Sequence, residues 1–275
     1  MKNQGSDFKL IETPEITYLT VPLLESAGAG AWFSTRRGGV SPPPYDSLNL
    51  GFHVGDRAAA VQENRTRLFT ALGLDPDSPV AGEQVHRDEL FIVDQRHKGR
   101  GVCSDQDALP GVDGLLTRSR GLPLSSYYAD CVPIYLLDPR RPAAGLVHAG
   151  WRGTVLRIGA RAIKAMTDTF GVRPGECLGA IGPSIGPCCY EVDEQVMSGL
   201  RQGFSNWRQL AEPAGPGRWK LDLAGANRQA LIEAGLRPEN IALAGYCTAC
   251  RRDLFFSYRF TGGKTGRMAS VLVLR

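Results

Sequence analysis

The sequence has little of what marks a membrane-spanning or exported protein. No window of its 275 residues approaches the roughly 18 consecutive apolar residues that predict a transmembrane helix. The first thirty residues carry charged and polar side chains throughout and lack the unbroken apolar core of a secretory signal. The cysteine count, seven, is odd, and a chain without such a signal is expected where thiols stay reduced. We therefore expect a cytoplasmic protein without a membrane partner, whose cysteines are free thiols or metal ligands.

The sequence also lacks a strong charge of one sign. Its 32 basic and 28 acidic residues give a net charge of +4, and the basic residues occur in short, scattered pairs such as Arg36-Arg37 and Arg251-Arg252. A nucleic-acid-binding surface needs a denser basic patch than this. The composition thus argues against a nucleic-acid partner, and nothing in the sequence identifies a protein partner.

Repeats and low-complexity tracts are absent too, so we interpret residues 1–275 as a single domain. With 43% hydrophobic residues, a chain of this length can bury a sizeable core. Helices are predicted at residues 56–72, capped by Asp56, at residues 153–170, ended by Gly171, and from about Asp222 onward. Apolar runs predict strands at residues 16–23, 31–35, 90–93, 114–117, 132–137 and 143–148. Because these strands cluster rather than alternate with helices, the sequence predicts an α+β fold.

The segment of residues 131–148 carries the most information about a site. Its Asp-Pro-Arg-Arg sequence at residues 138–141 suits a tight turn, with Asp in the first position and Pro in the second. If Asp138 pairs with Arg141, an antiparallel hairpin places Cys131 directly opposite His148, with Cβ atoms about 4.5–5.5 Å apart. A thiolate and an imidazole so placed reach one metal ion at about 2.0–2.3 Å. A slip of one residue would put the two side chains on opposite faces.

A third ligand has to come from elsewhere in the chain, which contains four histidines. His97 lies in a charged run and is predicted to be at the surface. His53 and His86 both remain candidates, because histidine is the commonest metal ligand and residue chemistry alone does not choose between them. The alternative interpretation of Cys131 is a buried apolar thiol.

The remaining cysteines give a weaker signal. Cys247 and Cys250 form a single Cys-x-x-Cys, which fits half of a zinc-ribbon site or a redox pair, but no second such motif completes a set of four. We expect free thiols there, near the pocket. Cys188 and Cys189 are adjacent, so their side chains are expected to point in different directions.

Short motifs occur along nearly the whole chain, at residues 35–41, 49–51, 53–56, 84–86, 113–114, 129–133, 148–154, 179–185, 189–192 and 255–259. Together they resemble the YfiH-like family, also called the laccase-domain or multicopper polyphenol oxidase family, to which purine nucleoside phosphorylase activity is assigned. The resemblance implies layered mixed β-sheets flanked by helices, with a distant likeness to cysteine hydrolase-like domains. It also implies a metal triad of His86, Cys131 and His148.

The function implied by the resemblance is the phosphorolysis of adenosine, inosine, guanosine and S-methyl-5'-thioadenosine, together with deamination of adenosine. The implied cofactor is Zn²⁺, with copper as the alternative metal. Three protein ligands leave an open fourth position, which is typical of catalytic zinc. The substrates would be small-molecule nucleosides and phosphate.

Other residues are assigned roles within this function. Asp130, beside a ligand, is our candidate for proton transfer, with a ligand-orienting or hairpin-capping role as an equal alternative. Arg36 is the first choice for phosphate because the glycines that follow let backbone approach a ligand, and Arg37 and Arg152 come next. Asn49 is the further substrate-binding candidate.

Three other functions stay open. A copper oxidase of phenols is disfavoured because multicopper oxidases use many histidines, usually in His-x-His pairs, and this chain has four histidines and no such pair. A cysteine hydrolase would use Cys131 as nucleophile and His148 as its base. A binding module would use the metal only as a structural clip.

Overall fold

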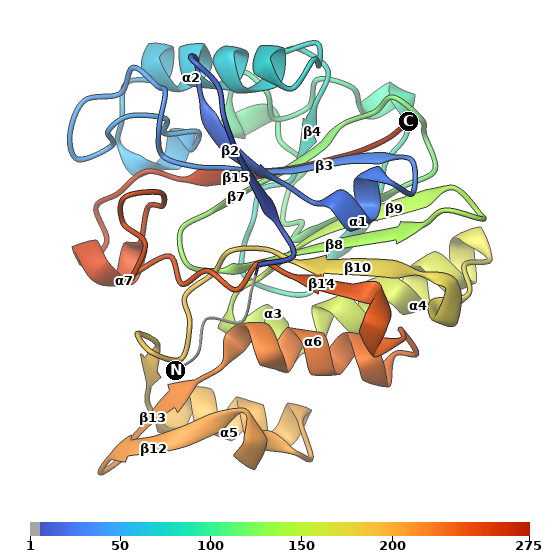
Figure 1. Cartoon of the computed structure of the whole chain (residues 1–275), viewed down its shortest axis with the longest axis vertical. Coiled ribbons are helices and arrows are strands. Elements are labelled where there is room, and N and C mark those ends of the chain that lie inside the picture. Colours follow the sequence, from blue (N-terminus) through green and yellow to red (C-terminus); the bar gives the residue numbers. More distant parts are fainter. Residues whose placement is uncertain (1–5) are drawn as a thin grey trace.

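The computed structural model describes residues 6–275 of the chain, which contain a pair of six-stranded sheets lying face to face (Figure 1). The first sheet has the strand order β1 (Lys9–Glu12), β2 (Thr17–Thr20), β3 (Ala29–Ser34), β15 (Met268–Leu274), β7 (Leu124–Tyr128) and β4 (Val80–Ala81). The second has the order β14 (Ile241–Leu243), β10 (Leu178–Ile181), β8 (Val132–Asp138), β9 (Ala143–Ala149), β6 (Gly114–Thr117) and β5 (Leu90–Ile92). Both contain parallel and antiparallel pairs, so the predicted α+β fold with layered mixed sheets is confirmed.

Helices cover the outer faces of both sheets (Figure 1). The first sheet is covered by α2 (Ala58–Ala71), and the second by α3 (Trp151–Val155), α4 (Ile158–Phe170) and α6 (Leu223–Glu233). Farther out lie α5 (Glu194–Gly203) and a small sheet of β11 (Glu191–Val192), β13 (Arg218–Leu221) and β12 (Ala211–Gly215). Two short helices are α1 (Pro22–Glu25) and α7 (Tyr258–Thr261). No helix within residues 6–275 is both long and apolar enough to cross a membrane.

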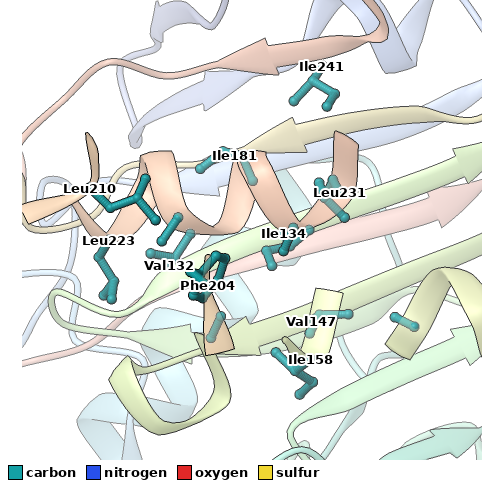
Figure 2. Packing of buried hydrophobic residues seen from close by; sticks show 14 of the residues in the cluster. Val132, Ile134, Val147, Ile158, Ile181, Phe204, Leu210, Leu223, Leu231 and Ile241 are labelled. Carbon is teal, nitrogen blue, oxygen red and sulfur yellow. The ribbon is translucent and has the colours of Figure 1, made fainter. Parts of the chain in front are cut away.

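The central strand β8 shows how the layers are held together. Val132, Ile134 and Leu136 face the helices, whereas Tyr135 and Leu137 face the first sheet, and all are buried. This alternation follows from the period of two in a strand, and burial on both faces explains why the strand is apolar throughout. Figure 2 shows Val132 and Ile134 packed among side chains that include those of α4 and α6.

The hairpin of β8 and β9 forms as predicted, but the predicted register is wrong by two residues. Asp138 pairs with Ala143, and His148 lies opposite Pro133 rather than opposite Cys131. The cause is local: the Asp138 side chain accepts hydrogen bonds from the backbone N–H groups two and three residues later, at 2.9 and 3.0 Å, and closes a four-residue connection. Because the shift is an even number, Cys131 and His148 still share a face, now as diagonal neighbours.

Two predicted helices also need correction. The helix predicted at 153–170 is divided into α3 and α4, because Arg157 adopts a left-handed conformation with φ of 60°. Gly171 does end α4, with φ of 69°. Asp56 does not cap α2, which begins two residues later. Its carboxylate instead accepts hydrogen bonds from the hydroxyl of Ser41 at 2.6 Å and the amide of Asn49 at 2.9 Å.

Candidate metal centre

Three side chains with metal-binding atoms meet at one cavity. The sulfur of Cys131 and one ring nitrogen each of His86 and His148 lie within 4.8 Å of one another. Ligands of a single zinc ion, at about 2.0–2.3 Å from it, need a separation of this order. Cys131 directly precedes β8, His148 belongs to β9, and His86 lies between β4 and β5. The residues therefore fit one metal ion, with two imidazoles and one thiolate as donors.

One buried carboxylate, that of Asp113, positions both histidines. Its Oδ1 lies 2.7 Å from Nδ1 of His148, which leaves Nε2 of that ring for a metal. The same oxygen accepts the backbone N–H of His86 at 3.0 Å, and Oδ2 accepts those of Val85 and Arg87 at 3.2 and 2.8 Å. These bonds hold His86 in its left-handed backbone conformation, with φ of 59°. Sequence reasoning assigned no role to Asp113, and its place just before β6, within a matching motif, is the one signal that could have found it.

The charges in the centre favour the metal-binding state of the thiol. Burial raises the pKa of Cys131, but the charge and hydrogen bonds of His148 and His86 outweigh burial and lower this pKa to about 6. Burial lowers the pKa of His148, whereas Cys131 and Asp113 act more strongly and raise it to about 9. Cys131 is thereby held as a thiolate, the form of cysteine that coordinates metals.

The close packing of the centre requires a glycine at position 150. A Cβ atom at Gly150 would lie 2.9 Å from Cδ2 of His86 and 3.3 Å from the sulfur of Cys131. Contacts of this length would displace the His86 ring. The glycine between β9 and α3 therefore allows the backbone to approach two of the three donors.

The cavity has a volume of about 750 Å³. This lies in the range of small-molecule sites, about 300–1,000 Å³. Besides the three donors, aromatic rings contribute to its wall, among them Tyr127, Trp151, Tyr190 and Tyr258. Such rings offer flat apolar faces to a planar ligand. The cavity therefore combines a reactive centre with surfaces suited to an aromatic substrate.

Three arginines in the cavity wall have no carboxylate partner within residues 6–275. They are Arg152, Arg259 and Arg267, and none of them forms an ion pair in this range. Their guanidinium groups lie over the rings of Trp151, Tyr190 and Tyr258, at 4.4, 4.9 and 5.8 Å from the centroids, respectively. Those of Arg259 and Arg267 also donate hydrogen bonds to backbone carbonyl oxygens. Guanidinium groups without a carboxylate partner suit an anionic ligand such as phosphate. Of these three, sequence reasoning had selected Arg152.

The other predicted substrate-binding residues lie outside the lining of this cavity. Arg36 donates hydrogen bonds to the backbone and carboxylate of Asp46, at 2.8 and 3.1 Å, and to the backbone of Arg252 at 3.2 Å, beside a separate, smaller hollow that Arg37 also lines. Asn49 is fully buried, and its side-chain oxygen accepts the backbone N–H of Arg267 at 2.9 Å. Asn49 thus touches the cavity only through the segment that carries Arg267.

Asp130 lies in the cavity wall beside Cys131, with φ of 86°. Its Oδ1 accepts the hydroxyl hydrogen of Thr248 at 2.6 Å, and its Oδ2 accepts the backbone N–H of Arg259 at 2.7 Å. Both carboxylate oxygens are therefore used to fasten the C-terminal segment next to the centre.

Four cysteines outside the cavity wall form a second cluster. Contrary to expectation, the side chains of Cys188 and Cys189 converge: their sulfurs lie 3.5 and 3.4 Å from that of Cys250. With Cys247 they make four thiols whose sulfurs all lie within 4.8 Å of one another. The adjacent pair lies in a turn that begins at Gly186, and alternation of side chains applies to strands, not to turns.

The fold and the centre together define a candidate metalloenzyme with a small-molecule cavity. The chain belongs to the multi-copper polyphenol oxidoreductase laccase family, whose model matches residues 30–275. It is 41% identical to the purine nucleoside phosphorylase YlmD of Geobacillus stearothermophilus over 90% of both chains, and 36% identical to the adenosine deaminase RL5 of an unknown prokaryotic organism, over 86% of this chain and 90% of that one. The crystal structure of the Bacillus licheniformis hypothetical protein YfiH has a TM-score of 0.94 and 36% identity, covering 98% of this chain and all of that one. The predicted family is thereby confirmed, and the relatives' names support an enzymatic role.

Proposed function

We propose that this protein is a zinc-dependent purine nucleoside phosphorylase that also deaminates adenosine. Its substrates would be adenosine, inosine, guanosine and S-methyl-5'-thioadenosine. The proposal rests on one observation: three metal-binding side chains lie in the wall of a cavity that three arginines also line. These arginines form no ion pair among the described residues. The names of relatives, one a purine nucleoside phosphorylase and one an adenosine deaminase, support it.

The zinc ion would be held by His86, Cys131 and His148. Three protein ligands leave a fourth position open, and zinc there supplies Lewis-acid chemistry. Asp113 keeps the His148 ring oriented so that Nε2 faces the other two donors. Arg152, Arg259 and Arg267 would bind the phosphate that reacts with the nucleoside.

In phosphorolysis, a phosphate oxygen forms a bond to the anomeric carbon of ribose while the bond from that carbon to the purine nitrogen breaks. The bonding electron pair leaves with the purine, which takes up a proton. The arginines would hold the attacking anion in place, and the aromatic rings of Trp151, Tyr190 and Tyr258 would hold the base. Positioning of this kind accounts for a large share of the rate acceleration in many enzymes.

Asp130 is assigned a positioning role in this scheme. Both of its oxygens already accept hydrogen bonds, which favours the anionic form fastening the wall over a carboxylic acid that donates a proton. Asn49 would act in the same indirect way, through the backbone of Arg267. Arg36 is left out of the proposed phosphate site because its guanidinium forms an ion pair with the carboxylate of Asp46 and lines a separate hollow.

A cysteine hydrolase is the second candidate, because Cys131, His148 and Asp113 are arranged as a nucleophile, a base and an orienting carboxylate. In that case a thiol alkylator would inactivate an enzyme that is active without metal. Copper-dependent phenol oxidation is less well supported. Only two histidines lie outside the centre: His53 in the cavity wall beside Asp105, and His97 beside Asp94. Two histidines are too few for the additional copper cluster.

The proposal is tested by following adenosine with the zinc-loaded protein in the presence and absence of phosphate, with products separated by chromatography. We expect adenine and ribose 1-phosphate only when phosphate is present, and inosine in both cases. His148→Ala should abolish both products, whereas His97→Ala, which changes a histidine outside the cavity lining, should retain them. Undiminished turnover in His148→Ala, or adenine release independent of phosphate, would contradict the proposal.

A further inference from the structure

The cluster of Cys188, Cys189, Cys247 and Cys250, here called the four-cysteine cluster, has the geometry of a metal site. A zinc ion with four thiolates at about 2.3 Å places neighbouring sulfurs about 3.8 Å apart in a tetrahedron. The sulfur of Cys250 lies 3.5 and 3.4 Å from those of Cys188 and Cys189, and all four sulfurs lie within 4.8 Å of one another. Small rotations of the side chains therefore bring the four sulfurs around one ion.

One backbone donor beside the cluster suits a thiolate at Cys247. The backbone N–H of Gly186 points at the sulfur of Cys247 from 3.2 Å, and hydrogen bonds of this kind stabilise a charged sulfur. Cys188 and Cys250 are exposed, so an ion can enter from solvent. Within residues 6–275 the cluster contains no histidine or carboxylate, and a purely thiolate set selects a soft or borderline metal over magnesium or calcium.

We propose that the four-cysteine cluster binds a second zinc ion with a structural role. Four protein ligands fill the tetrahedron and leave no position for a substrate, which distinguishes this site from the three-donor centre. A single disulfide would involve only two of these cysteines. It would not explain why the sulfurs of the other two also lie within 4.8 Å. The proposal does not depend on the reaction catalysed in the cavity.

The second ion would fasten two loops that support the cavity wall. Cys188 and Cys189 follow β10, whereas Cys247 and Cys250 follow β14, and the two strands run parallel. The loops already touch beside the cluster, where the backbone N–H of Thr248 donates to Ser184 at 3.0 Å. The hydroxyl of Thr248 in turn reaches the carboxylate of Asp130. A metal clip would therefore keep Thr248 in place for its hydrogen bond to Asp130.

The test counts zinc in the purified full-length protein by mass spectrometry of the metal. We expect about two zinc ions per chain in the wild type, one for each cluster, and the loss of about one in Cys250→Ser and in Cys188→Ser. His148→Ala should also lose about one, but from the other site. Cys103→Ser is the matched control, because Cys103 is exposed and lies outside both clusters, and it should retain both ions.

Cobalt substitution distinguishes the two sites even where a variant folds poorly. In the wild type, the visible spectrum of bound Co²⁺ should show strong thiolate-to-cobalt charge transfer, and His148→Ala should keep most of it because the four-thiolate site remains. The proposal would be overturned if Cys250→Ser and Cys188→Ser contained as much metal as the wild type. It would equally be overturned if the four thiols of the metal-loaded wild type reacted with a thiol reagent as fast as Cys103.

Discussion

The two cysteine-containing clusters of this protein differ in number of donors, surroundings and access. The cavity centre has two imidazoles and one thiolate, and it lies in the wall of a cavity of about 750 Å³. The carboxylate of Asp113 contacts the His148 ring and orients it. The four-cysteine cluster joins two loops at the surface, and none of its members lines the cavity. An incomplete set of ligands beside a cavity suits catalysis, whereas a complete set between loops suits structure.

The two clusters also differ in how far they depend on a tightly packed environment. The donors of the cavity centre come from three separate segments, and Asp113, Gly150 and the β8–β9 hairpin must all be correct for them to meet. The four cysteines come from two short segments, each supplying two sulfurs. Changes to the packing should therefore affect the cavity centre far more than the four-cysteine cluster.

The largest selective effect is expected from Gly150→Ala. The new methyl group would press on the His86 ring from 2.9 Å and on the sulfur of Cys131 from 3.3 Å. We expect phosphate-dependent turnover to fall by about 100-fold, the upper end of the loss seen when a metal ligand is misoriented. Gly175→Ala is the control, since a Cβ atom there meets no atom closer than 3.9 Å. Normal zinc content and turnover in Gly150→Ala would refute the tight packing of the centre.

A smaller effect is expected from Asp113→Asn, which removes the charge that orients His148 and weakens the hold on the His86 loop. Zinc affinity of the cavity centre should fall about 10–100-fold, as measured by competition with a chelator. The four-cysteine cluster should keep its ion in the same sample. Asp94→Asn changes a half-exposed carboxylate that belongs to neither cluster and should alter neither affinity.

The smallest effect concerns the pH dependence of cysteine labelling in chelator-treated protein. The pKa of Cys131 is lowered to about 6, so its thiolate forms as the pH rises through 6, and its alkylation rate should level off above about pH 7. Burial raises the pKa of Cys177 to about 12, so this cysteine should stay unlabelled throughout. Mass spectrometry of peptides gives both rates. Labelling of Cys131 that begins only above pH 8 would show that His148 does not stabilise the thiolate.

Much of the centre could be predicted from the sequence because its key elements are local. A shift of the hairpin register by an even number of residues leaves its Cys and its His on the same face. The prediction that Cys131 and His148 share a face was therefore correct although the predicted register was wrong by two residues. The error itself arose from the Asp138 side chain, whose hydrogen bonds lengthened the turn. His86 was identified by the family resemblance, since its chemistry alone did not separate it from His53.

What the sequence could not predict depends on contacts between distant segments. Arg259 and Arg267 reach the cavity because β15 lies beside β7 in the first sheet, which brings the C-terminal segment to the centre. Asp113 acquires its role only when β6 pairs with β9 and the His86 loop folds over it. The four-cysteine cluster needs β10 and β14 to run side by side, which no local pattern of cysteines reveals.

The most direct test of the catalytic metal centre is a zinc titration of metal-free protein while adenine release is followed with phosphate present. We expect no release before zinc is added, a rise that saturates once the cavity centre is filled, and no release at any zinc concentration in His148→Ala. Full adenine release by the metal-free wild type would contradict the catalytic metal centre.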